Sequence, residues 1–284
     1  MLKWVLRQVP LAVFSSLFLL SVPSPGQTPN CLGSSASDNP AAREELNQGV
    51  DSYKGARYSE AISHFQKATE LAPCLTLARA YLGTAQAQNV VPGLHTPDNL
   101  KTADASVENF KVVLAQNPHD INSLKQVAAV YFSTMRFDDA REWQKKVLAE
   151  DPNDSEAAYT IGVIDWTRAH THALAALTVA GLQDDGEGNH DAPPEVLESI
   201  SRQNRALVEE GLQYLRRAIE GRPNYDDAMA YMNLVYRRQA DVDYQNPALR
   251  DEDVAKAKEW AHKAMQTRKE NEEKKASSTD SPQP

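Results

Sequence analysis

The residues of this sequence most able to do chemistry are three histidines near its middle. His170 and His172 lie two residues apart in a segment with helical spacing, and His190 follows beside Asp191. Imidazole and carboxylate groups are common metal ligands. On a helix, residues two apart point roughly 200° away from each other, so His170 and His172 cannot ligate one metal unless the helix breaks there. The sequence therefore predicts no metal site at these histidines.

Two polar features next to the histidines have simpler explanations than ligand binding. His172 shares a helix face with Asp165 and Arg168, which is typical of a polar surface stripe with a salt bridge. The loop that begins at Asp184 is acidic and could suggest calcium, but it has no glycine at the sixth position of an EF-hand loop. We expect a solvated acidic loop.

No catalytic signature is present in the sequence. It contains no G-x-S-x-G, no P-loop, no H-E-x-x-H and no paired C-x-x-C. The two cysteines, Cys31 and Cys74, cannot form a structural zinc site by themselves. They either pair in a disulfide or remain thiols, and the sequence leaves both alternatives open. We predict a protein that is not an enzyme and that carries no cofactor and no metal.

Small residues and prolines recur with a fixed spacing. Gly49 and Gly83 lie 34 residues apart, as do Pro118 and Pro152. Pro73 and Pro118 are 45 apart, which indicates an insertion of about 11 residues in one unit of this period. A later unit carries about 37 extra residues by the same argument. Few glycines and apolar residues spaced three and four apart favour helices.

The best-preserved unit, Arg43 to Leu75, resembles the tetratricopeptide repeat (TPR). The resemblance lies in Gly49, Tyr58, Ala61, Phe65, Ala68 and Pro73. It implies an all-α, TPR-like α-solenoid of about five helix–turn–helix repeats. It also implies a right-handed superhelix in which the first helix of each repeat, helix A, lines the concave side. The repeats are predicted at 42–75, 76–120, 121–154, 155–225 and 226–269, within a domain spanning 41–269.

The fourth repeat is predicted to be an overlong hairpin. Helical spacing continues to about Ala180 and resumes at about Glu195, with a Gly/Asp/Pro-rich loop between. The extension, residues 169–201, either offers a docking surface or packs on itself, and both alternatives remain open. In the second repeat, helix B is expected at about Ala103–Gln116, after an insertion.

The N-terminus has the features of an export signal. Lys3 and Arg7 precede the apolar run Leu11–Val22, and residues 1–26 are predicted to be a signal peptide. The alternative is a retained anchor, but the run is short of the roughly 20 residues that span a membrane. We expect an exported protein, periplasmic or secreted, with no membrane insertion after removal of the signal. Residues 27–40 are predicted to be a flexible leader and 270–284 a disordered tail.

The formal charge of −9 argues against nucleic-acid binding. The resemblance instead implies a non-enzymatic scaffold that binds a protein or peptide partner in the cell envelope through its concave groove, as part of assembly or transport complexes. Leu46 and Val50 replace the Lys and Asn of the family's carboxylate clamp, so an extended or helical apolar segment is the better ligand. The groove residues in the family's register are Tyr53, Gln88, Lys125, Phe132, Tyr159, Trp166 and Arg237. The alternative is a metal-binding or enzymatic protein that uses the extended hairpin; the partner's identity and the oligomeric state are not predicted.

Overall fold

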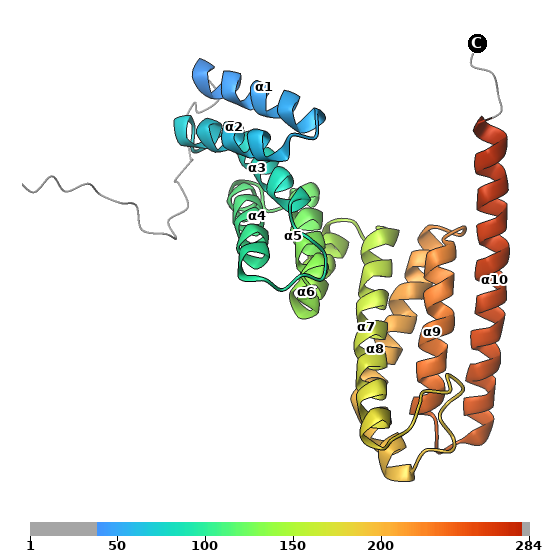
Figure 1. Ribbon diagram of the computed structural model, residues 1–284. Coiled ribbons are helices and arrows are strands. Elements are labelled where there is room, and N and C mark those ends of the chain that lie inside the picture. Colours follow the sequence, from blue (N-terminus) through green and yellow to red (C-terminus); the bar gives the residue numbers. More distant parts are fainter. Residues whose placement is uncertain (1–38, 280–284) are drawn as a thin grey trace, which may run out of the picture.

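Ten α-helices and no strands make up residues 39–279, the part of the chain that this computed structural model describes (Figure 1). They pack in sequential pairs: α1 (Pro40–Lys54) with α2 (Tyr58–Leu71), α3 (Thr76–Gln88) with α4 (Pro97–Gln116), α5 (Ile121–Ser133) with α6 (Phe137–Glu150), α7 (Ser155–Val179) with α8 (Pro194–Gly221), and α9 (Asp226–Val242) with α10 (Pro247–Thr279). The prediction of an all-α fold is confirmed. The predicted signal peptide lies outside the described residues, and no helix within them is long and apolar enough to cross a membrane.

The recurring small residues lie where the two helices of a pair cross. A Cβ atom on Gly83 would lie 2.9 Å from the Phe110 ring, and one on Gly162 would lie 2.5 Å from Cγ of Leu215. Phe110 and Leu215 are fully buried. The spacing of small residues therefore reflects close helix crossings, at which larger side chains would push the pair apart.

Two separate apolar cores hold the stack together. A small core joins α1, α2 and α3 around Phe65, and a larger one runs from α4 to α10 through Phe110, Ile161, Leu215 and Met232. Each helix packs mainly on its neighbours in sequence, as in a repeat architecture.

Helix α4 begins earlier than the sequence predicted, at Pro97 instead of Ala103. Proline suits the first turn of a helix because its missing N–H group has no partner there anyway. The buried side chain of Asn99 accepts a hydrogen bond from the N–H of Val91 at 2.8 Å and donates to the carbonyls of Val91 and Leu94. The Asn99 amide thus joins the loop between α3 and α4 to the first turn of α4.

The prediction of a disordered tail from residue 270 is wrong as far as Thr279, because α10 continues through this segment. Asn271 donates hydrogen bonds to the carbonyl of Asn224 and to Oδ1 of Asp226, both at 3.0 Å. Beyond it, Glu, Lys and Ala are strong helix formers. The bonds of Asn271 and high helix propensity therefore extend α10 past the rest of the stack.

The extended parts of α7 and α8 have a core of their own. Ala173 and Leu177 of α7 pack with Leu197 and Ile200 of α8, and Tyr244 from the α9–α10 turn packs against them. Ser201 Oγ also donates to the carbonyl of Val242 at 2.9 Å. In Figure 1, α7 to α10 stand side by side along this length. These side chains therefore pack on each other, which is the alternative to a docking surface that the sequence left open.

Cys74, which follows α2, is disulfide-bonded. Cys31, the other cysteine of the sequence, lies outside the described residues.

Candidate functional site

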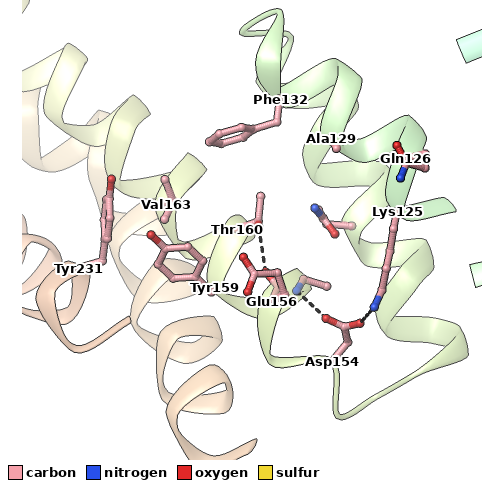
Figure 2. A pocket seen from close by; sticks show the side chains of 12 residues that line it. Lys125, Gln126, Ala129, Phe132, Asp154, Glu156, Tyr159, Thr160, Val163 and Tyr231 are labelled. Carbon is pink, nitrogen blue, oxygen red and sulfur yellow. Dashed lines mark hydrogen bonds and ion pairs between the residues drawn. The ribbon is translucent and has the colours of Figure 1, made fainter. Parts of the chain in front are cut away.

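A groove of about 510 Å³ lies between α5, α7 and α9. Phe132 of α5 and Tyr159 and Val163 of α7 point toward the same hollow (Figure 2). Helix α6 contributes Gln144 to the lining. The remaining lining residues come from α5, α7 and α9 or their flanks: Lys125, Gln126, Ala129, Asp154, Glu156, Ala157, Thr160 and Tyr231. The groove is thus apolar in its middle and polar at one end.

The polar end is built around Asp154, the N-cap residue of α7. Its carboxylate accepts a hydrogen bond from the N–H of Ala157 at 2.9 Å and forms an ion pair with Lys125. Burial raises the pKa of Asp154, but the bonds from Lys125 and Ala157 outweigh it, so the pKa lies below its usual range. Lys125 is the one cation among the residues lining the groove, and this carboxylate already neutralises it.

Tyr159 and Tyr231 form the opposite wall, and the buried Tyr225 packs behind them. The ring centroid of Tyr159 lies 4.8 Å from that of Tyr225 and 5.6 Å from that of Tyr231. Burial raises the pKa of all three phenols, so they remain neutral donors at physiological pH. The Tyr225 hydroxyl donates to Glu156 Oε2 at 2.7 Å. Packed rings of this kind form a rigid apolar surface with polar edges.

The loop between α7 and α8, residues 180–193, crosses α9 toward α10 near the lower end of the long helices (Figure 1). We call residues 184–190 of this loop the strap. Asp184 forms an ion pair with the buried Arg238 at 2.8 Å, and Glu187 forms one with Lys258 of α10 at 2.9 Å. The Gly186 carbonyl accepts from Arg237 at 2.7 Å. The expectation of a solvated acidic loop is therefore wrong for Asp184, because cations of α9 hold the loop down.

Comparison with known proteins gives relatives in structure alone. No family model matches the sequence, and no curated protein does. Among solved structures, MamA 41-end from Desulfovibrio magneticus RS-1 is similar over 82% of this chain and 97% of its own, with 15% identity and a TM-score of 0.55. A crystal structure of the MamA protein is similar over 86% of this chain and 98% of its own, with 15% identity and a TM-score of 0.52. YrrB, described as a TPR protein with an unusual peptide-binding site, covers 81% of this chain and 92% of its own, with 13% identity and a TM-score of 0.50.

The chain has the tetratricopeptide-repeat fold. Three of the predicted TPR groove residues, Lys125, Phe132 and Tyr159, meet in the groove of Figure 2. Trp166 lies just beyond it, where its ring is 5.3 Å from that of Tyr231 and stacks on His170 at 5.0 Å. Whether these residues bind a partner stays a prediction.

The other predicted groove residues of the TPR solenoid lie elsewhere. Tyr53 and Gln88 lie near the small core of the first repeats, where burial raises the pKa of Tyr53 and a hydrogen bond with Gln88 opposes that rise. Arg237 lies under the strap, bonded to the Gly186 carbonyl. The predicted set is therefore split among three places along the solenoid.

Sequence reasoning missed one row of lining residues in the TPR groove. Gln126, Thr160 and Tyr231 occupy the sixth position of helix A in three successive repeats, and all three line the groove. The register that placed Lys125 and Tyr159 at the fifth position also identifies the sixth. Tyr231 is the residue that this row would have added to the aromatic set.

The histidines of the extended repeat face different neighbours. His172 Nδ1 lies 3.1 Å from Asn204 Oδ1 on α8, whereas His170 stacks on Trp166. Within residues 39–279 no group of three or more His, Cys, Asp and Glu side chains is arranged to hold a metal ion.

The predicted surface stripe of His172, Asp165 and Arg168 is wrong. Asp165 is fully buried between α6 and α8, with Arg141 as its nearest cation. Arg168 instead pairs with Asp138 at 2.6 Å. The helix turns Asp165 inward because Gly211 of α8 leaves room for its side chain.

Proposed function

We propose that this protein is an exported TPR scaffold that binds an apolar segment of a protein partner in the groove between α5, α7 and α9. The observation that carries the proposal is the groove itself: half-buried Phe132, Tyr159 and Tyr231 surround a volume of about 510 Å³. Aromatic side chains dominate binding energies at protein interfaces, because they bury a large area with few rotatable bonds. The peptide-binding site named for YrrB, which has the same fold, supports this proposal.

The charges of the groove favour an apolar ligand over a terminal carboxylate. Lys125 is the one cation of the lining, and Asp154 neutralises it. A carboxylate entering the groove would therefore lose water without gaining a free cation. Apolar side chains would gain free energy from burial against Ala129, Val163 and the rings.

We place the protein outside the cytoplasm, in the periplasm or as a secreted protein. The support for this location is the basic start, apolar run and small residues of positions 1–26. An assembly or transport complex in the cell envelope is the setting that such a scaffold would serve.

The groove is tested by changing its volume in both directions. Peptides selected from a random library displayed on phage, with the purified chain as bait, would be measured by fluorescence anisotropy. Ala129 is exposed and lines the groove, so Ala129→Trp fills it without removing a core side chain. Phe132→Ala removes an aromatic wall. We expect both changes to weaken binding at least about tenfold, or about 1.4 kcal/mol.

Two controls separate binding from folding. Ala129→Ser keeps the groove open, and Val179→Ala removes an apolar side chain that is 91% exposed outside the groove. Both should bind as the wild type does, and circular dichroism should show every variant folded. Folded Ala129→Trp that binds the selected peptides with unchanged affinity would refute the groove.

A further inference from the structure

The strap lies on the continuation of the groove along α7. Tyr159, Val163, Trp166 and His170 follow one another at spacings of four, three and four, which places them on one helix face. The first two line the groove and the third lies beside it. His170 Nδ1 then lies 3.8 Å from Asp184 of the strap. A segment that followed this face out of the groove would meet the strap.

Three cations lie beneath the strap. Two carboxylates and one main-chain carbonyl of the strap contact them. Arg238 donates to Asp184 Oδ1 at 2.8 Å, and Lys258 pairs with Glu187 at 2.9 Å. Arg237 donates to the Gly186 carbonyl at 2.7 Å. Arg237 and Arg238 come from the A helix of the last repeat, the same class of helix that lines the groove. The surface under the strap therefore carries three cations and one fully buried carboxylate, Asp241.

The strap is fixed by apolar contacts only at its flanks. Leu182 before it and Ala192 after it pack into the core of the extended hairpin. Between them, the strap is polar and contains Gly186 and Gly188 at positive φ. A Cβ atom on Gly188 would lie 2.8 Å from Arg250 of α10, so the backbone itself lies against the helix. The middle of the loop is thus held by ion pairs, by main-chain bonds and by the buried side chain of Asn189, which donates to Oδ1 of Asp241 at 2.8 Å.

A partner for Arg238 remains when the strap is absent. Arg238 Nη1 lies 3.0 Å from Oδ2 of the fully buried Asp241, which belongs to the same helix. Arg238 would therefore keep one carboxylate neighbour if Asp184 withdrew. Leaving this cation without any partner would be far more costly.

We propose that the strap is a ligand bound in cis, and that Arg237, Arg238 and Lys258 beneath it form a binding surface for an acidic, extended segment of a protein partner. This inference rests on the proposed function: apolar residues of the partner occupy the groove, and the acidic residues that follow them displace the strap. While the strap is in place, a partner can bind only in the groove. A partner with acidic residues displaces the strap and extends its binding site onto α9 and α10.

The test supplies the strap in trans. In one full-length variant, residues 184–190 are replaced by a Gly/Ser linker of equal length, which keeps Leu182 and Ala192 in place. The probe is a labelled synthetic peptide with the sequence of residues 182–191 and blocked ends. We expect saturable binding to this variant by fluorescence anisotropy and at least about tenfold weaker binding to the wild type, since a tethered strap competes at an effective concentration on the order of millimolar.

The charges of both partners provide the controls. A peptide with every Asp and Glu changed to the amide should not bind. In the linker variant, Lys258→Gln should weaken binding, whereas Lys263→Gln should not, because Lys263 lies over the Trp260 ring at 4.7 Å on the same helix. Ala129→Trp should leave binding of this peptide unchanged, which separates failure of the strap site from failure of the groove.

Clear outcomes would overturn the proposal. They are a folded linker variant that does not bind the acidic peptide, equal binding of the amide peptide, and wild-type binding as tight as that of the variant. Should circular dichroism show the linker variant unfolded, Asp184→Asn with Glu187→Gln keeps the strap's length and removes the carboxylates that pair with Arg238 and Lys258, while the Gly186 carbonyl still caps Arg237. The same peptide and the same criteria then apply to that variant.

Discussion

Asp165 is a buried carboxylate that its surroundings satisfy poorly. Its side chain has 0% exposure, and Arg141 Nε lies 3.3 Å from Oδ1. That contact is not aligned as a hydrogen bond, and neither oxygen has another protein partner. Burial raises the pKa of Asp165 to about 7, although Arg141, Arg168 and Lys145 oppose the rise. The protonated acid is therefore favoured in the folded protein over a wide pH range.

This pKa predicts the direction of one pH effect on stability. The folded pKa of about 7 lies above the ordinary pKa of an aspartate, 3.8, so the folded state holds the proton more tightly. The contribution of Asp165 to stability is present below about pH 4 and is lost as pH rises to about 7 and above. Asp165→Asn removes the ionisation and should raise the free energy of unfolding at pH 8 by about 1–3 kcal/mol, with little difference at pH 4.

Urea unfolding at pH 4, 6 and 8 measures this effect. Asp51→Asn, at an exposed position of α1, is the matched control and should follow the wild type at each pH. An Asp165→Asn variant that is no more stable than the wild type at pH 8 would contradict the assigned cause.

The extended hairpin of α7 and α8 is, on its inner side, an apolar core. Leu177 is 1% exposed, whereas Leu174, one turn earlier on the same helix, is 39% exposed. Leu177→Ala should therefore lower the free energy of unfolding by about 2–4 kcal/mol, the usual cost of a cavity. Leu174→Ala removes the same atoms from the exposed face and should cost less than about 1 kcal/mol. Chemical denaturation measures both, and equal effects would show that the extension is loosely packed.

The elements that the sequence predicted well are those fixed by helix pairing. The boundaries of α7 and α8 follow from apolar spacing interrupted by a loop rich in Gly and Asp. The early start of α4 rests instead on Pro97 and on bonds of Asn99 to its preceding loop, and the continuation of α10 past residue 270 begins with bonds of Asn271 to the distant Asn224 and Asp226. Periodicity alone therefore located the repeats better than their ends.

The candidate site was also predicted only in part, because the repeat register does not show contacts between distant parts of the chain. The repeat register assigned Lys125 and Phe132 of α5 and Tyr159 of α7 to the concave side, and the structure places them in one groove. It placed Arg237 there too, but a loop fifty residues earlier in the chain covers that arginine. Likewise, Asp165 was assigned to the surface because helical spacing does not show that α6 and α8 close over it. Contacts between elements far apart in sequence account for each of these differences.

At the scale of the whole molecule, stability is distributed unequally along the solenoid. The core of α1 to α3 is small, and it is separate from the larger core that runs from α4 to α10. In a repeat protein each unit gains stability mainly from its neighbours, so the first repeat, which among residues 39–279 has a neighbouring repeat on one side, opens at lower free energy.

This arrangement predicts that the chain unfolds in two stages. Hydrogen exchange measured by mass spectrometry should show α1 and α2 exchanging before α7 and α8 under native conditions. Phe65 has no exposed surface and belongs to the small core, so Phe65→Ala should speed exchange in α1 to α3 and leave α7 to α10 unchanged. The matched change in the large core, Ile161→Ala, should speed exchange from α4 to α10. If Phe65→Ala instead speeds exchange equally in every helix, the two cores unfold as one cooperative unit, and the binding groove then depends on the first repeat for its stability.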